Sequence, residues 1–278
     1  MHTSHCLNCT ATLTENAKFC ANCGQTAHPH RLSIGHIVHD GLHFFLHADK
    51  SIFTLIKKLA TQTGTVAREF IEGKRKKYFP PLNFYLIVSG LLVLSMTTFN
   101  IFEKGAAANN QQLEAIVASI PDPIAKAKAK AKIYTIMKRQ SNAMYAIKKY
   151  SNVLGMCAIP LLSFLIYLFY CRGRYNYAEH LIANLYSGGF MAVFFSLIVL
   201  PLMALIDNAW VSSVAMVVYF LADLVFRSIY YYKFMNRPGT AAALKAVGVL
   251  LLVQLIWFAI VLVLMFWYIK SGMSGLFA

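Results

Sequence analysis

The sequence contains few charged residues: Asp, Glu, Lys and Arg make up 13% of its 278 residues, about half the share that is usual in a globular domain. Hydrophobic residues make up 58%, so the chain is not a disordered one. Acidic residues are especially scarce, with 11 Asp and Glu against 26 Lys and Arg and a net charge of +15. In a membrane protein, such an excess usually faces anionic lipid rather than nucleic acid.

The sequence also lacks the local motifs of several large enzyme classes. It contains no HExxH, no GxSxG and no glycine-rich phosphate loop. No secretory signal precedes the apolar part, because residues 1–80 are polar and rich in cysteine. These absences favour a membrane protein that is not an enzyme.

Five apolar stretches are long enough to cross a bilayer core, which takes roughly 20 residues of helix. They are residues 82–102, 153–171, 181–206, 209–232 and 246–269. Only the stretch 209–232 contains charged residues, Asp223 and Arg227. Helices are expected because lipid offers no partner to unpaired backbone groups. The sequence therefore predicts a bundle of about five transmembrane helices.

The distribution of Lys and Arg predicts the orientation of this bundle. With the N-terminus in the cytoplasm, most basic residues lie in cytoplasmic segments, and the turn Asp207-Asn208, which has none, lies outside. The C-terminus is then outside as well. The basic loop 103–152 fits this orientation poorly, so its side stays open. Within the loop, Asp122 is expected to cap a helix that begins at Pro123.

Two cysteine pairs form the strongest local pattern, Cys6-x2-Cys9 and Cys20-x2-Cys23-Gly24. Zinc prefers four tetrahedral ligands, and a site closed by four cysteines is structural rather than catalytic. Gly24 permits a tight turn in which backbone N–H groups approach the sulfurs. A reducing cytoplasm favours metal over disulfides. The pattern predicts structural zinc, and the alternatives are a redox dithiol, disulfides or no bound metal.

These features divide the chain into three segments: a zinc-ribbon module at 1–30, a His-rich amphipathic and basic juxtamembrane region at 31–81, and a transmembrane domain at 82–278. The predicted fold class is an all-α integral membrane protein with a small N-terminal zinc ribbon and amphipathic juxtamembrane helices.

Four histidines in the juxtamembrane region share one face of an expected helix. They fall within about 80° of one another at 100° per residue and are His36, His39, His43 and His47. Pairs one turn apart could bind a second metal. The same face could sense pH, since an unperturbed histidine titrates at about 6.5. Alternatively, the helix lies on the membrane or on the bundle, and its histidines are tolerated polar residues.

A run of basic residues follows, directly before the first predicted span: Lys74, Arg75, Lys76 and Lys77. Beside the aromatic pair Tyr78-Phe79, this run suits lipid headgroups, at roughly 1 kcal/mol per basic residue near an anionic surface. Nucleic acid is not an expected partner, since no base-reading element accompanies the run.

Two polar pairs lie in or beside the apolar stretches. Asp223 and Arg227 are four residues apart, so they can pair on one helix. Charges inside a membrane often mark a transport path or a partner contact. Glu179 and His180 stand at the entrance of the stretch 181–206 and could handle protons, although neighbours in sequence do not share a helix face. For both pairs, a structural role and a functional role stay open.

Four segments together resemble one known family: residues 19–25, 39–50, 67–80 and 177–180. They are similar to an uncharacterised group of bacterial multi-pass membrane proteins with an N-terminal zinc ribbon, the domain-of-unknown-function family numbered 3667. The resemblance covers residues 1–85 well and the rest loosely. A Pro-Gly pair that is frequent in the family is Thr63-Gly64 here. The resemblance implies a bacterial inner membrane and no known activity.

Three functions compete on this sequence. The first is a non-enzymatic membrane protein whose zinc ribbon is a cytoplasmic docking or sensing platform, with anionic lipids and a protein as partners. The second is a small transporter or permease that uses Glu179, His180, Asp223 and Arg227. Five spans are few for a transporter, and a homo-oligomer would supply further helices. The third is a membrane-embedded metalloenzyme that uses His39, His43, His47 and His180.

Overall fold

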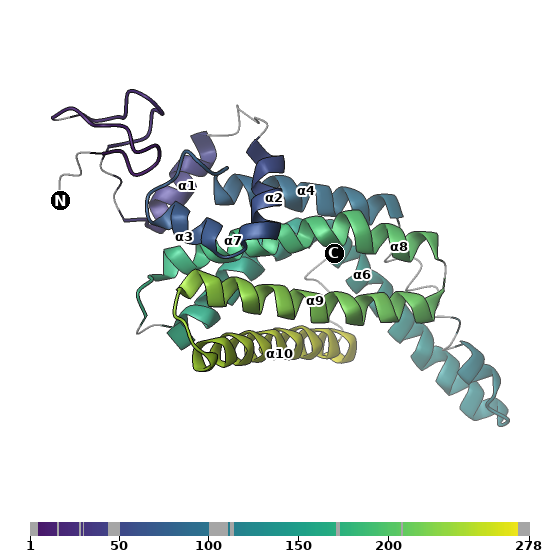
Figure 1. The fold of residues 1–278 in the computed structure, drawn as a ribbon. Helices are drawn as coiled ribbons and strands as arrows, with labels where there is room; N and C mark the ends of the chain where they lie inside the picture. Colours follow the sequence, from purple (N-terminus) through teal and green to yellow (C-terminus); the bar gives the residue numbers. More distant parts are fainter. Residues whose placement is uncertain are drawn as a thin grey trace. The chain divides into compact units, whose positions relative to one another are not determined.

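The computed structural model describes residues 5–15, 17–27, 29, 31–43, 51–99, 111, 114–170, 173–206 and 208–271. Its helices are α1 (Ile34–His43), α2 (Ser51–Gln62), α3 (Thr65–Ile71), α4 (Pro81–Phe99), α6 (Pro123–Tyr170), α7 (Tyr177–Phe194), the π-helical turn η1 (Phe195–Val199), α8 (Leu200–Leu205), α9 (Ala209–Met235) and α10 (Thr240–Ser271) (Figure 1). Among the described residues, strand pairing is limited to two isolated bridges, His5 with Thr12 and Phe19 with Thr26. The all-α prediction is confirmed.

Four helical segments are long and apolar enough to cross a membrane, with mean hydropathies from 1.6 to 3.0. They are Pro81–Phe99, Tyr177–Leu205, Trp210–Met235 and Thr240–Trp267. These helices indicate a membrane-embedded protein. The remaining predicted span corresponds to a shorter apolar segment, Leu154–Tyr170, at the end of α6. A count of five spans therefore stays a prediction.

Local sequence explains two features of these helices. The amides of Ile124 and Ala125 donate to the Asp122 carboxylate at 3.1 and 3.2 Å. Asp122 thus caps α6, and Pro123 is its first residue, as expected. The π-helical turn η1 ends two residues before Pro201. Because proline has no N–H to donate and its ring crowds the preceding turn, a widened turn accommodates it.

The chain forms two compact units. The first comprises Met1–Ser89, Ile159–Val193 and Leu221–Val253, and the second comprises Gly90–Ala158, Phe194–Phe220 and Gln254–Ala278. The predicted segment boundaries at residues 30 and 81 both fall inside the first unit. The candidate site residues that the structure describes all belong to that unit. Its buried core includes Leu55, Leu59, Phe84, Tyr186 and Phe234, all with no more than 1% of their surface exposed.

The juxtamembrane helix α3 begins in close backbone contact with α9. A Cβ on Gly64 would overlap the carbonyl oxygen of Tyr230 and would lie 2.7 Å from the amide nitrogen of Phe234. Only glycine fits this approach. The preceding Thr63 has a φ of 44°, and its hydroxyl accepts a hydrogen bond from Lys233 at 3.0 Å. The Thr63-Gly64 pair therefore fixes the juxtamembrane helices against the end of α9.

In the second unit, the first turns of α6 carry the Ala-Lys repeat. Lys126, Lys128 and Lys132 are exposed, and the Lys126 amine donates to the carbonyl of Ala118 at 3.2 Å. A groove of about 770 Å³ lies between this part of α6 and the stretch 114–118. The repeat is a solvated helix in the described part of this unit.

Candidate metal centre

The two cysteine pairs lie on turns that repeat the same hydrogen bonds, with Cys20 in the place that Cys6 has in the first turn. The amide of Cys6 donates to the carbonyl of Ala11 at 2.8 Å, and the amide of Cys20 donates to the carbonyl of Gln25 at the same distance. The bridges of His5 with Thr12 and of Phe19 with Thr26 show the same offset. The ribbon is therefore built from two equivalent turns.

Each turn passes through a left-handed residue after its second cysteine. These residues are Thr10, with a φ of 62°, and Gly24, with a φ of 67°. Glycine adopts this conformation without cost, whereas it strains a β-branched threonine. The amides of Thr10 and Gly24 donate to the carbonyls of Cys6 and Cys20, each at 2.9 Å. The glycine at position 24 predicts its turn from the sequence, whereas the threonine at position 10 does not predict the equivalent turn.

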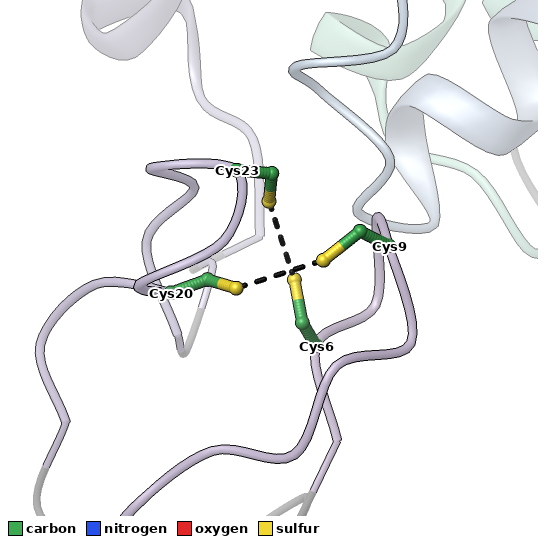
Figure 2. A group of neighbouring side chains, drawn as sticks. All are labelled: Cys6, Cys9, Cys20 and Cys23. Carbon is green, nitrogen blue, oxygen red and sulfur yellow. Dashed lines mark hydrogen bonds between the residues drawn. The ribbon is translucent and has the colours of Figure 1, made fainter.

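The four sulfurs of the ribbon point toward one another (Figure 2). The Sγ atoms of Cys6 and Cys23 are 3.7 Å apart, and those of Cys9 and Cys20 are 3.6 Å apart. All four lie within 4.8 Å of one another. A zinc ion at about 2.3 Å from four tetrahedral sulfurs holds them about 3.8 Å apart, whereas a disulfide needs about 2.05 Å. The four cysteines therefore fit a single tetrahedral metal ion.

Backbone amides approach two of these sulfurs, as expected for a tight turn. The amide of Ala11 bonds the Cys9 sulfur and lowers the pKa of that thiol to about 6. The amide of Gln25 bonds the Cys23 sulfur in the equivalent position. At Cys23, desolvation is the larger effect and raises the pKa to about 11. N–H groups directed at sulfur stabilise the thiolate form that a metal requires.

The ribbon is held on the turn that precedes α4 by Gln25. Its side-chain N–H donates to the carbonyl of Gly73, and its Oε1 accepts from the amides of Arg75 at 3.0 Å and Lys76 at 3.3 Å. Gln25 is 3% exposed. A Cβ on Gly73, whose φ is 115°, would lie 2.8 Å from Cδ1 of Leu7 in the other turn. Both halves of the ribbon thus rest on the Gly73 turn, a contact that the sequence analysis missed.

The basic run before α4 is partly neutralised by Glu69 of α3. Its carboxylate accepts from the amines of Lys74 at 3.0 Å and Lys77 at 2.6 Å, and from the hydroxyl of Tyr78. Burial raises the pKa of Glu69, but the hydrogen bonds from Lys77, Tyr78 and Lys74 outweigh it and lower the pKa to about 2. Two of the four residues predicted to meet lipid headgroups therefore contact Glu69, and the headgroup role stays a prediction.

The predicted histidine face is described only at its start. His36 is exposed on α1, and its Nδ1 lies 3.1 Å from the hydroxyl of Ser33. His39 and His43 belong to α1, but their side chains are outside the described part of the structure. His47 lies outside the described residues. The hypotheses of a second metal and of a pH-sensing face are therefore still predictions.

Glu179 completes the capping box of α7 and pairs with a distant arginine. Its amide donates to the Asn176 side chain at 2.9 Å, and its Oε2 accepts from the Asn176 amide at 2.7 Å, which is a capping box. Nε and Nη2 of Arg31 each donate to the carboxylate at 3.0 Å. This pairing raises the pKa of Arg31. The 3%-exposed carboxylate is thus fully engaged in joining the segment after the ribbon to α7.

His180, the next residue, lies in a cage of aromatic rings with 0% of its surface exposed. The rings of Tyr170 and Tyr231 stack on it at 5.9 and 6.0 Å, and Phe234 meets it edge-on at 5.8 Å. Neither imidazole nitrogen, nor the buried hydroxyl of Tyr230, has a hydrogen-bond partner among the described residues. We call His180, Tyr230 and these three rings the His180 cluster. Glu179 and His180 therefore face different surroundings.

Asp223 and Arg227 form an ion pair on α9, with 2.8 Å between Nε of the arginine and Oδ1 of the aspartate. Their side chains are 14% and 19% exposed. On α7, the position of a Cβ on Gly188 is 3.9 Å from the Arg227 guanidinium. The pair therefore packs close to α7 rather than extending freely into the surroundings.

Comparison with known families supports the resemblance over one part of the chain. Residues 49–93 match the family described as Protein of unknown function (DUF3667). The match covers α2, α3, the basic turn and about the first two thirds of α4, and it includes neither the cysteines nor Glu179 and His180. No curated protein and no solved structure matches the chain. The comparison therefore assigns no activity.

Proposed function

We propose that the chain is a non-enzymatic integral membrane protein of the bacterial inner membrane whose zinc ribbon is a cytoplasmic docking or sensing platform. One observation carries the proposal. A four-sulfur site with the spacing of a zinc centre is held, through Gln25, on the turn directly before the first apolar helix α4. The ribbon is thus attached to the membrane part at a defined place.

Zinc fits this site by the chemistry of its donors. Cys6, Cys9, Cys20 and Cys23 would hold the ion, which would stabilise the two turns as one module. Four sulfur ligands leave no open position for water or substrate, so the role is structural. A cytoplasmic N-terminus and an external C-terminus, as the basic residues predict, would keep these thiols reduced.

Two surfaces suit partners of different kinds. On the ribbon, the ring of Phe19 is 64% exposed and gives a protein partner an apolar contact. On the basic run, Lys76 is exposed beside the first apolar helix, where anionic headgroups would lie. The platform would therefore recognise a protein through the ribbon while the basic run holds lipid.

Metal content of the detergent-purified protein tests the platform. We expect one zinc ion per chain, lost in Cys20→Ser and retained in Cys157→Ser, a matched control because Cys157 is an exposed free cysteine of α6. When zinc is lost, the protein should also lose its docking to a partner, and less of that partner should be recovered with it. A protein without zinc would refute the proposal. A second metal that disappears when the four histidines of the predicted face are changed to alanine would instead support the metalloenzyme.

A small transporter is the second candidate, favoured by the buried His180 nitrogens, which have no partner in the described part of the chain, and by the Asp223–Arg227 pair in an apolar helix. Proton flux into liposomes, followed with a pH-sensitive dye, distinguishes the two functions. Transport predicts that Asp223→Asn abolishes the flux, whereas the platform predicts no flux above that of empty liposomes in either protein.

A further inference from the structure

We infer that Gln25 is the positioning residue that transmits the metal state of the ribbon to the entrance of the first span. With metal bound, Gln25 keeps the Gly73 turn closed; without metal, the turn is released and the backbone of the basic run Lys74–Lys77, whose Lys76 side chain is already exposed, becomes accessible to a protease. This inference rests on the proposed metal site. It concerns the side chain of Gln25, which is not itself a metal ligand and which bonds the Gly73 turn.

The backbone of Gln25 belongs to the metal-binding turn. Its N–H bonds the sulfur of Cys23, and its carbonyl accepts from the amide of Cys20 at 2.8 Å. A residue bonded on both sides to metal-binding cysteines cannot keep its position when the turn opens. The place of Gln25 therefore depends on the closed sulfur cluster.

The apolar surface that the ribbon buries is too small to hold Gln25 in place without metal. Among the described residues of 5–27, the buried apolar side chains are Cys6, Cys20 and Ala27. Two cysteines and one alanine bury too little surface to fold a segment of this length, so the metal must supply the folding free energy. Loss of metal should unfold the ribbon rather than loosen it slightly.

The side chain of Gln25 completes the hydrogen bonds of the Gly73 turn. It bonds the Gly73 carbonyl and the amides of Arg75 and Lys76, and it crosses 48 to 51 residues of sequence to do so. Leu7 covers the other side of the turn. When the ribbon unfolds, the turn loses three hydrogen bonds and its apolar cover together. The Glu69 contacts of Lys74, Lys77 and Tyr78 remain, and the backbone around Gly73, Arg75 and Lys76 opens more readily.

Limited trypsin digestion of the full-length protein in detergent tests this transmission. Trypsin needs an extended backbone, and the turn contains four cleavable residues, Lys74–Lys77. We expect zinc-loaded protein to be cleaved there slowly, and a zinc chelator to raise the rate about tenfold or more. Added zinc should restore protection. Cleavage in the exposed Lys126–Lys132 stretch of α6 serves as an internal control that the chelator leaves unchanged.

Variants of Gln25 separate transmission from metal binding. Gln25→Ala loses the three hydrogen bonds but keeps Leu7 on the turn, so it should be cleaved clearly faster than the parent, at up to the rate of the chelated protein, while it retains one zinc per chain. Gln25→Glu keeps an acceptor for the Arg75 and Lys76 amides and loses the donor to Gly73, so its rate should lie between. Thr14→Ala, an exposed ribbon position, is the matched control and should behave like the parent.

Three results would overturn the inference. If the chelator removes zinc without changing cleavage at Lys74–Lys77, the metal site stands but its state is not transmitted. If Gln25→Ala is as resistant as the parent, another contact closes the turn. If Gln25→Ala loses its zinc, Gln25 maintains the metal site instead of transmitting its state. A parent protein without zinc would refute the proposed function first.

Discussion

Two polar regions of the first unit differ in how their buried groups are satisfied. In the juxtamembrane network, defined by Gln25, Glu69 and Glu179 with their partners, each side chain makes at least three hydrogen bonds. In the His180 cluster, the imidazole nitrogens and the Tyr230 hydroxyl have no partner among the described residues. The hydrogen bonds of the network hold distant segments of the chain together, whereas unpaired polar atoms mark a place for water, a proton or a ligand.

The largest effect should follow from breaking the network at Glu179. Glu179→Ala removes the buried carboxylate that bonds the Asn176 amide in the capping box and accepts two hydrogen bonds from Arg31, so we expect the free energy of unfolding to fall by about 2 to 3 kcal/mol. Thermal unfolding in detergent measures this change in stability. Arg174→Ala is the control, because Arg174 makes an exposed 3.4 Å pair with Glu72 that should contribute less than about 0.5 kcal/mol. Equal effects of the two variants would contradict a stabilising role for the buried Glu179 carboxylate and its contacts.

A smaller, pH-dependent effect is expected at Glu69. Its pKa is about 2 in the folded protein and about 4.3 when unfolded, so its ionised form stabilises the fold above pH 4.3. That contribution disappears as the pH falls from about 4.3 toward 2. Since the lysine partners are 38% and 35% exposed, solvent reduces it to about 1 to 2 kcal/mol.

The measurement compares the parent with Glu69→Gln across this range. The parent should be the more stable protein at pH 6, and the difference between the two should shrink below pH 4.3. Protonation of the zinc ligands affects both proteins equally and cancels in the difference. A difference that stays constant from pH 6 to pH 3 would show that the lysine and tyrosine contacts do not depend on the charge of Glu69.

The smallest effect, and one of opposite sign, should come from the His180 cluster. His180→Phe keeps an aromatic ring in the cage and removes two unpaired nitrogens, so stability should be unchanged or raised by up to about 1 kcal/mol. Tyr186→Phe provides a contrast, because the Tyr186 hydroxyl donates to the carbonyl of Phe79 at 2.7 Å and its loss should destabilise. Clear destabilisation by His180→Phe would indicate that water or another group pairs with the imidazole.

The secondary structure followed closely from the sequence because its signals are local. Apolar runs predicted 209–232 and 246–269, and the structure has Ala209–Met235 and Thr240–Ser271. The cap at Asp122 was predicted from two adjacent residues. The four cysteines were predicted from their spacing, and their sulfurs do converge. The end of α6 was harder, because a basic helix runs directly into an apolar one without a break.

Contacts between distant segments were not predictable in this way. Arg31 and Glu179 are 148 residues apart, and nothing near either residue identifies its partner. The sequence brought Glu179 and His180 together as one candidate site, whereas the helix directs one to an arginine and the other into an aromatic cage. Gln25 lies directly after the second cysteine motif in the sequence, yet its role depends on a turn 48 residues away.

The sequence by itself determined that this protein is helical and membrane-embedded, and that four cysteines form a module, because hydrophobic runs and ligand spacing act over short stretches of chain. Only the tertiary structure decided which polar groups are paired and which are not. That outcome depends on which surfaces meet, such as the backbone of α9 against Gly64, where a single Cβ would prevent the contact. The attachment of the ribbon to the membrane part is a property of this packing.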